Sequence, residues 1–203
     1  MKKLFLTLAL VLGALTAAHA QIGIVGGWTT AKTPTGSDAL SPKNASLFHA
    51  GVAYKIELGP VFTLQPALVY QGKAASVTEG TDVLYSRANF LELELGAQVG
   101  IDLLALRPYF LFEPFIGLDL GAHNKVNGDV QTVLNNAKNR FEYGFGVGAG
   151  IDLLNHFQIS VQWFMNLGKL YDGNKLAVGD YDFSKYANLR NYQGVKITLG
   201  LFF

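Results

Sequence analysis

The chain has 203 residues, half of them hydrophobic, and it contains no cysteine, which excludes disulfide bonds and thiolate metal sites. Its formal net charge is +1, and the 14 basic and 15 acidic residues that remain without Lys2 and Lys3 give no reason to expect nucleic acid as a partner. After residue 20 no run of about 18 apolar residues occurs, which excludes a helical membrane protein.

The first twenty residues have the pattern of an export signal. A positively charged start is followed by an apolar stretch at residues 4–15 and by Ala-His-Ala at residues 18–20, which is a small-x-small cleavage site. This pattern predicts a secretory signal peptide, residues 1–20, that is cleaved before Gln21. Residues 21–203 are then expected to form a single domain.

Beyond this segment, apolar residues alternate with small or polar ones, which is the period-two pattern of β-strands. From Phe48 to Leu58 every second residue is apolar, and the residues between them include Gly51, Lys55 and Glu57. The same alternation predicts about eight strands, at residues 21–31, 48–58, 62–71, 91–99, 110–120, 141–153, 157–166 and 191–203.

The connections between these strands alternate in length, with short turns between four long polar segments at residues 32–46, 72–86, 122–139 and 169–190. Short periplasmic turns and long outer loops are typical of bacterial outer-membrane barrels. The sequence therefore predicts an all-β fold, an up-and-down antiparallel transmembrane β-barrel in the bacterial outer membrane. Both termini are expected to be periplasmic, with the first and last strands paired. Pro66 and Pro114 each remove a ladder donor, so we expect local bulges or widened pairing there.

The rows opposite the apolar ones carry most of the charge of the strands, which distinguishes the inside of the barrel from its lipid-facing outside. An eight-stranded barrel has an interior just wide enough for side chains, so these charges are expected to form a packed, ion-paired plug. Glu94 is expected roughly opposite Glu113, with Lys196 or Arg107 as the counter-ion. A structural network is the favoured interpretation, and a proton or ion path is the alternative. The expected lumen network consists of Lys55, Glu92, Glu94, Arg107, Glu113 and Lys196.

Two further patterns bear on chemistry. Every second residue from 144 to 150 is glycine, which indicates room for larger side chains on the next strand rather than a nucleotide loop. His49, His123 and His156 are too scattered for a metal cluster, and no feature brings a serine, a histidine and an acid together. We therefore expect no catalytic, metal-binding or cofactor-binding residues.

The last long segment contains Tyr171, Tyr181 and Tyr186, which are candidates for contacts outside the cell. Rigid amphipathic aromatic side chains suit recognition. A loop folded over the barrel rim explains the same composition equally well.

Four segments carry a family signal: Phe-His-Ala-Gly-Val at residues 48–52, Phe-Thr-Leu-Gln-Pro-Ala-Leu-Val-Tyr at residues 62–70, residues 107–117, and the closing residues 194–203. In them the chain resembles the PorT-like outer-membrane β-barrel family, in which a strand close to F-x-L-Q-P-x-L-x-Y recurs. The resemblance implies a small single-chain barrel and no enzyme, and some relatives are linked to protein secretion or gliding. It also implies that Phe203 belongs to the signal that the barrel-assembly machinery recognises.

The expected protein is thus a small integral outer-membrane barrel with an occluded lumen, which serves as a structural or interaction component through its extracellular loops. Its expected partners are outer-membrane lipid, the barrel-assembly machinery and an envelope protein. A narrow pore for ions or small solutes is the first rival hypothesis, and a lipid-modifying enzyme is the second. Conductance and lipid turnover are the measurements that separate the three.

Overall fold

The structure is a computed structural model, and all the regular structure in its described part is β-strand. Within that part, no helix has the length and hydropathy that a membrane span requires. The described residues are 20–32, 41–79, 82–126, 129–133, 141–168, 177–178, 181–182 and 193–203.

Alternating apolar and polar residues form eight long strands, which are β1 (Ala20–Lys32), β2 (Ser41–Glu57), β3 (Phe62–Glu79), β4 (Asp82–Gly100), β5 (Leu106–Val126), β7 (Phe141–Leu153), β8 (Phe157–Asn166) and β11 (Gln193–Phe202). Three short strands accompany them, namely β6 (Asp129–Val133), β9 (Ala177–Val178) and β10 (Tyr181–Asp182).

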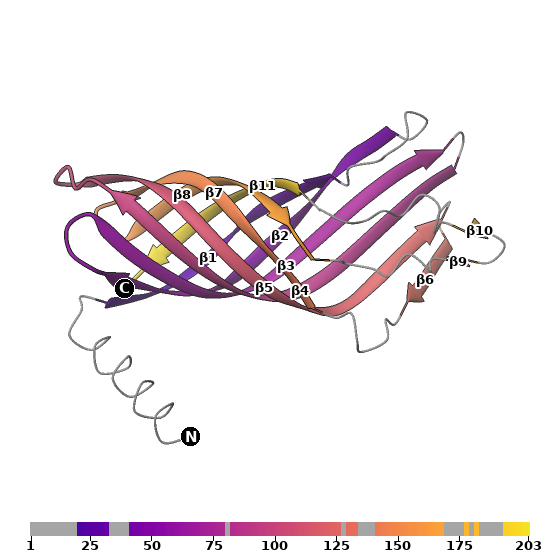
Figure 1. The fold of residues 1–203 in the computed structure, drawn as a ribbon, viewed down its shortest axis with the longest axis horizontal. Coiled ribbons are helices and arrows are strands. Elements are labelled where there is room, and N and C mark those ends of the chain that lie inside the picture. The colour runs from indigo at the N-terminus through magenta and orange to yellow at the C-terminus, as the bar shows by residue number, and fades with distance from the viewer. Residues whose placement is uncertain are drawn as a thin grey trace, which may run out of the picture.

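The eight long strands close into one antiparallel, up-and-down barrel (Figure 1). Each long strand pairs with the next long strand along the chain, and β1 closes the ring by pairing with β11 from Gly23–Phe202 to Lys32–Gln193. Closure leaves no sheet edge in the barrel wall, where hydrocarbon could not satisfy free backbone groups. The predicted fold and the predicted pairing of the first and last strands are confirmed.

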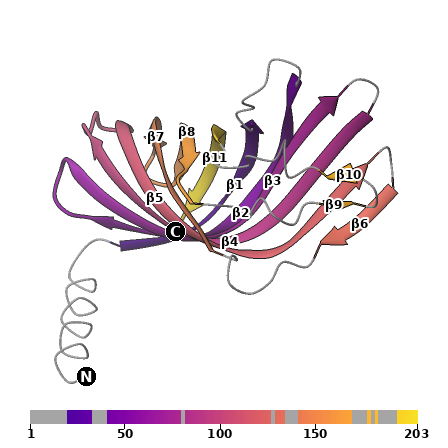
Figure 2. The ribbon, with the colours of Figure 1, turned by 45° about the vertical axis from the view of Figure 1, so that its right-hand side comes forward.

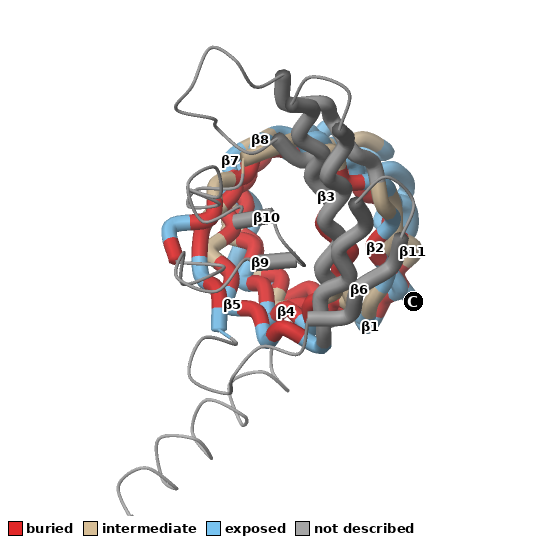
Figure 3. The backbone as a smooth tube through the Cα atoms, turned by 90° about the vertical axis from the view of Figure 1, so that its right-hand side faces the viewer, coloured by how far each residue is buried: buried red, intermediate tan, exposed pale blue. Residues whose placement is uncertain are grey.

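The barrel is polar inside and apolar outside. Buried and exposed residues alternate along its wall (Figure 3). Along β8 exposed and buried residues alternate, and the buried ones include Gln158, Ser160 and Gln162, while the exposed ones include Ile159 and Val161. A protein folded in water shows the reverse arrangement. The apolar exterior is therefore the face that lipid solvates.

Four of the strands extend well beyond their predicted ends. The sequence predicts long loops at residues 32–46, 72–86 and 122–139, but β2 already begins at Ser41, β3 and β4 stay paired to their ends, and β5 continues to Val126 with β6 alongside it. The loop prediction was wrong here because period-two apolar patterning reports contact with lipid. A strand that has left the apolar band needs only backbone pairing to continue.

These extensions form a sheet that projects from one end of the barrel (Figures 1 and 2). Two β-bulges lie at its base, one between Asn44 and His49 in the β2–β3 pairing and one between Asn89 and Phe90 in the β4–β5 pairing. Bulges bend a strand and increase its twist, so they mark where the sheet departs from the barrel wall. We define the projecting sheet as residues 41–44, 75–79, 82–88, 122–126 and β6.

Tight turns close the opposite end, which we call the turn end. Gly59 has a φ of 94°, where glycine is the natural residue, and Asn155 has a φ of 59°, which asparagine tolerates. Leu104 and Leu154 have φ values of 60° and 53°, which are strained for leucine. The backbone N–H of Leu154 donates to the carbonyl of Ala105 at 2.9 Å, so two neighbouring turns support each other.

The two strand prolines interrupt pairing without shifting it. In the β2–β3 ladder the paired residues pass from Ala53–Ala67 to Ile56–Leu64 in unchanged register, which leaves a gap at Pro66. The β4–β5 ladder has the same gap at Pro114. The sequence predicts either bulges or widened pairing at the two prolines. The structure shows interrupted pairing without bulges there, because the loss of one N–H donor does not require an extra residue in the strand.

Candidate functional site

Charged side chains fill the barrel interior in three clusters. They meet there because every second residue of a barrel strand points into the lumen. Counted from the turn end toward the projecting end, the first cluster is Lys55, Arg107 and Asp152, the second is Lys196, Glu94 and Glu113, and the third is Lys73, Glu92 and Glu142.

The first cluster ties opposite walls of the barrel at the turn end. Lys55 Nζ on β2 lies 2.9 Å from Asp152 Oδ1 on β7, and these two strands are four positions apart around the ring in either direction. Arg107 Nη1 lies 3.1 Å from Asp152 Oδ2 and donates to Gln98 Oε1 at 3.2 Å. Gln158 Nε2 donates to Asp152 Oδ1 at 2.9 Å. The carboxylate of Asp152 thus accepts bonds from three strands.

The second cluster also crosses the lumen. Lys196 Nζ on β11 donates to Glu94 on β4 and to Glu113 on β5, each at 2.7 Å. Gln162 Nε2 donates to Glu113 at 2.6 Å. All four side chains are buried, so the ion pairs are shielded from bulk water and the loss of one partner would leave a desolvated charge.

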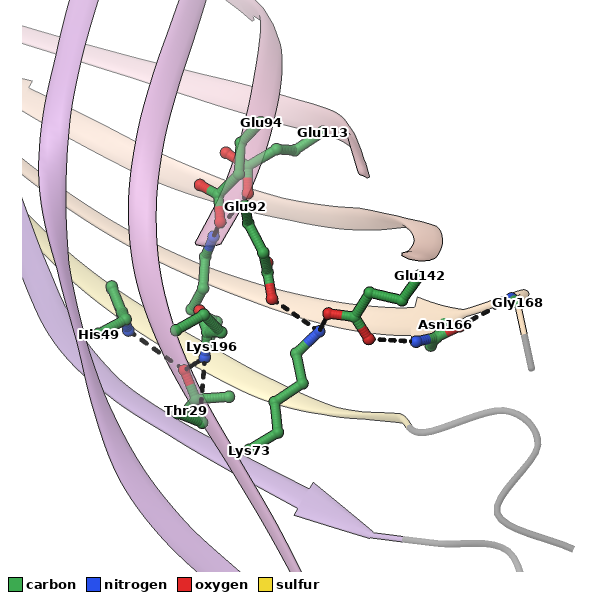
Figure 4. Close-up of polar contacts among 12 residues, drawn as sticks. Thr29, His49, Lys73, Glu92, Glu94, Glu113, Glu142, Asn166, Gly168 and Lys196 are labelled. Carbon is green, nitrogen blue, oxygen red and sulfur yellow. Dashed lines mark hydrogen bonds and ion pairs between the residues drawn. The ribbon is translucent and has the colours of Figure 1, made fainter. Parts of the chain in front are cut away.

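A chain of neutral polar groups borders the second cluster (Figure 4). His49 lies between two threonine hydroxyls, with Nδ1 3.1 Å from Thr29 Oγ1 and Nε2 3.1 Å from Thr198 Oγ1. Gln71 Nε2 donates to Thr29 Oγ1 at 2.6 Å. This chain joins four neighbouring strands, β3, β2, β1 and β11, and hydroxyls suit it because they both donate and accept.

The third cluster closes the interior toward the projecting end (Figure 4). Lys73 Nζ lies 2.8 Å from Glu92 and 2.7 Å from Glu142, and Asn166 Nδ2 donates to Glu142 at 2.5 Å. Three aromatic rings surround the same ammonium, with centroids 4.6 to 5.5 Å from Nζ, and they belong to Phe90, Phe115 and Phe164. The faces of aromatic rings attract a desolvated cation, so both the two carboxylates and the cation–π contacts stabilise the ammonium of Lys73.

Little space remains between the clusters. One enclosed cavity of about 10 Å³ lies beside Lys196 and His49, and a second of about 10 Å³ lies between Lys73 and Lys196. Each has room for about one water molecule. The interior is therefore a packed polar core, as expected of an eight-stranded barrel.

The six residues of the predicted lumen network all point inward, but they divide among the three clusters. Glu94 pairs across β4–β5 with Phe115, so the carboxylates of Glu94 and Glu113 are diagonal neighbours and not directly opposite. Lys196 contacts both, whereas Arg107 lies in the first cluster. The structure places Lys55 beside Arg107 and Glu92 with Lys73.

Sequence reasoning missed Lys73, the cation of the third cluster, because it ended the strand at Gln71. The sequence did contain a signal for Lys73, which is the alternation of side chains along the strand. Thr63, Gln65 and Gln71 face inward, and Lys73 continues the same row at every second position. Extending the row by one position would have found it. Glu142 lies on the inward row of the strand at residues 141–153, but nothing in the sequence showed which cation it meets.

The alternating glycines of β7 lie where large side chains need room. Gly146 pairs with Phe164 and Gly148 pairs with Gln162 on β8. A Cβ atom at Gly148 would lie 2.6 Å from Cα and Cβ of Gln162, closer than real contacts allow. The glycines thus let the backbones of β7 and β8 approach while their neighbours fill the lumen.

The remaining predicted residues lie near the ends of the chain's described segments. Phe203 is 67% exposed, and its N–H donates to the carbonyl of Ile22 at 2.8 Å, which extends the closing seam to the last residue. Tyr181 begins β10, whereas Tyr171, Tyr186 and residues 1–19 of the predicted signal segment lie outside the described residues. The last residue of that segment, Ala20, begins β1. In the part of the chain that the structure describes, no group of three or more histidines and acidic residues could hold a metal ion.

An apolar exterior, a closed ring of eight antiparallel strands and a charged, packed interior together define an integral outer-membrane β-barrel. Residues 4–203 match the family described as outer membrane protein beta-barrel domain, and the chain belongs to this family. Membership places the protein in the bacterial outer membrane.

The fold is similar to three solved structures of small barrels. The attachment invasion locus protein Ail of Yersinia pestis is 13% identical, with a TM-score of 0.45, and the match covers 90% of this chain and 97% of that one. Neisserial surface protein A is 12% identical, with a TM-score of 0.44 and coverage of 91% and 99%. OprG from Pseudomonas aeruginosa is 12% identical, with a TM-score of 0.41 and coverage of 92% and 97%. The comparison with curated proteins gave no significant match.

Proposed function

We propose that this protein is an interaction component of the outer membrane, and that its binding surface is the projecting sheet. The observation that carries the proposal is the asymmetry of the strands. Among the described residues, the strands on one side of the barrel continue beyond it and gain β6, while the described parts of β7, β8 and β11 end at the barrel. A filled lumen supports binding at a surface over transport through the interior.

The projecting sheet offers the backbone groups that such binding needs. Among the described residues, 41–44 pair only with β3, and β6 pairs only with β5. Each therefore presents a row of backbone N–H and C=O groups at an edge. An extended segment of a partner protein can add to such an edge as a further strand. The partner class is thus an envelope or cell-surface protein with an extended segment.

We infer an orientation with the turn end in the periplasm and the projecting sheet outside. The short turns, the start of β1 at Ala20 and Phe203 lie together at one end of the barrel, which is the usual periplasmic arrangement. We propose with this orientation that a signal peptide is cleaved before Gln21 and that outer-membrane lipid surrounds the apolar band. We also propose that the barrel-assembly machinery recognises Phe203 and inserts the barrel. The PorT-like resemblance supports the finer family assignment and the link to secretion or the cell surface.

The test is to trim the projecting sheet and leave the barrel intact. Replacing residues 75–86 by Asn-Gly joins Ala74 to Arg87, which already pair, through a turn that suits a two-residue hairpin. The variant removes every partner of residues 41–44 and three of the five partners that residues 122–126 have on β4, so both edges lose their support in the sheet. Photo-crosslinking on intact cells should capture a partner with the full chain and lose it with the trimmed chain. Heat-modifiable migration serves as the control for insertion. Equal capture by both proteins would refute the proposal.

The last long segment of the sequence, at residues 169–190, is the alternative binding surface under the same proposal. Substituting Tyr171, Tyr181 and Tyr186 by serine leaves the projecting sheet unchanged. Loss of crosslinking in this variant and not in the trimmed variant would move the binding surface from the sheet to this segment.

The pore hypothesis conflicts with an interior that has room for about one water molecule in each enclosed cavity. Stable, ion-selective conductance in planar bilayers, abolished by Glu113→Ala, would establish a pore and overturn the interaction role.

We also propose that the protein has no enzymatic activity. His49 is 2% exposed and both its ring nitrogens face threonine hydroxyls, so it has no access to a lipid substrate. Turnover of lipopolysaccharide or phospholipid that is lost in His49→Ala would contradict this proposal.

A further inference from the structure

The turn end of the barrel opens into a cavity of about 380 Å³. Its floor is the first charged cluster, and its rim is formed by the turns that follow β2, β4 and β7. The volume falls in the usual range for small-molecule sites. This cavity lies at the opposite end of the barrel from the projecting sheet.

The floor of the cavity carries an excess positive charge. Lys55, Arg107 and Asp152 are 3%, 9% and 4% exposed, so two buried cations share one buried carboxylate. Arg107 spends its donors on Asp152, Gln98, the carbonyl of Val61 and, through Nε, the exposed Asp102 on the rim. Lys55 has three N–H donors, and among the described contacts it reaches only Asp152 and the face of the Phe202 ring. Lys55 can therefore donate to a further acceptor in the cavity.

The rim of the cavity carries the opposite charge. Glu57 is exposed beside the cavity, and Asp102, on the next turn, is 60% exposed and 3.5 Å from Arg107 Nε. Leu104 and Leu106 add apolar surface next to these carboxylates. A ligand that enters this cavity meets negative charge first and positive charge at the bottom.

We infer that this cavity binds a small zwitterion of the amino-acid or short-peptide class, with its carboxylate on Lys55 and its ammonium between Glu57 and Asp102. The polarity of the cavity selects this class. A ligand with only a negative charge is repelled by the rim, and a ligand with only a positive charge is repelled by the floor. An apolar side chain of the ligand would lie against Leu104 and Leu106. Charge-assisted hydrogen bonds to a buried ammonium are the strong ones, so Lys55 is the main anchor.

The experiment measures binding of the dipeptide Gly-Leu to the purified, folded full chain in detergent micelles by isothermal titration calorimetry. Two matched probes each lack one charge: N-acetyl-Gly-Leu has no ammonium, and Gly-Leu-amide has no carboxylate. We expect Gly-Leu to bind, and each single-charge probe to bind about tenfold more weakly, as expected for the loss of one charge-assisted contact. Equal binding of the three probes, or no binding of Gly-Leu at about 10 mM, where weak small-ligand sites fill, would overturn the inference.

Rim variants keep the test independent of barrel folding. Glu57→Gln combined with Asp102→Asn changes only exposed side chains, and it should weaken Gly-Leu about tenfold, whereas N-acetyl-Gly-Leu, which the rim no longer repels, should bind at least as tightly as it binds the wild type. Lys55→Met should abolish binding of Gly-Leu and N-acetyl-Gly-Leu, with heat-modifiable migration as the check on folding. Leu154→Asn is the control and should bind like the wild type, because Leu154 does not line the cavity although its neighbour Asn155 does. A rim variant that weakens all three probes equally would contradict the proposed ligand orientation.

Discussion

Replacing Lys196 by methionine should destabilise the folded barrel by about 3–5 kcal/mol, the usual cost of removing one partner from a buried ion pair. Lys196 is 6% exposed and holds Glu94 and Glu113 at 2.7 Å each. Both carboxylates are themselves buried, so they would stay in the lumen without a cation or enough water. Methionine fills a similar volume, which keeps the packing change small. The loss is large against a total stability of about 5–15 kcal/mol.

The measurement is urea-induced unfolding of the protein in phospholipid vesicles, followed by the fluorescence of Trp28 and Trp163 on the barrel exterior. The matched control combines Lys196→Met with Glu94→Gln and Glu113→Gln, which removes the unpaired charges and should recover most of the loss. A loss below about 1 kcal/mol in the single variant, the level of an exposed pair, would refute the reasoning. An equal loss in the neutral triple variant would do the same.

Three further changes probe other parts of the barrel. Gly148→Val should strongly reduce the fraction of folded, heat-modifiable protein, because a Cβ at this position meets the backbone of β8 and overpacking costs about 3 kcal/mol. The control, Ala149→Val, changes a neighbouring lipid-facing residue and should fold normally. Equal yields of the two variants would contradict the packing argument. Leu154→Asn should raise the free energy of unfolding in urea by about 0.5–1 kcal/mol, because asparagine tolerates the φ of 53°. An unchanged or lower free energy of unfolding would show that the turn is not strained. Deletion of Phe203 should impair insertion in cells, and wild-type levels of membrane-inserted, heat-modifiable protein would exclude its role as an assembly signal.

The barrel strands could be predicted from the sequence because lipid imposes a strict pattern on them. Each residue in the wall faces either hydrocarbon or the lumen, so the alternation around Phe157 to Asn166 is unbroken and sets the strand and its orientation together. The same pattern located the tight turns, since glycine, asparagine and proline interrupt it. Local chemistry was therefore enough for the fold class and the order of the strands.

The projecting sheet and the partners of the charges could not be predicted in the same way. Polar residues at 75–79 and 82–88 are compatible with a loop or with strands, and only pairing to an existing barrel strand decides between them. The partner of Lys196 is likewise set by the curvature of the ring, which brings β11 opposite β4. One-dimensional patterning specifies which side chains enter the lumen, but the closed geometry specifies which of them meet.

The three lumen clusters and the projecting sheet are mechanically connected. An isolated sheet of a few short strands is marginally stable in water. Here β3 and β4 enter the sheet in the register that the barrel fixes, and β2 and β5 enter it after one bulge each. The barrel therefore aligns these strands before they leave the membrane. Lys73 and Lys196 strengthen this base, because their ion pairs join β3 and β11 to strands on other sides of the ring. A closed, ion-paired lumen therefore suits a protein whose barrel holds a binding surface in place.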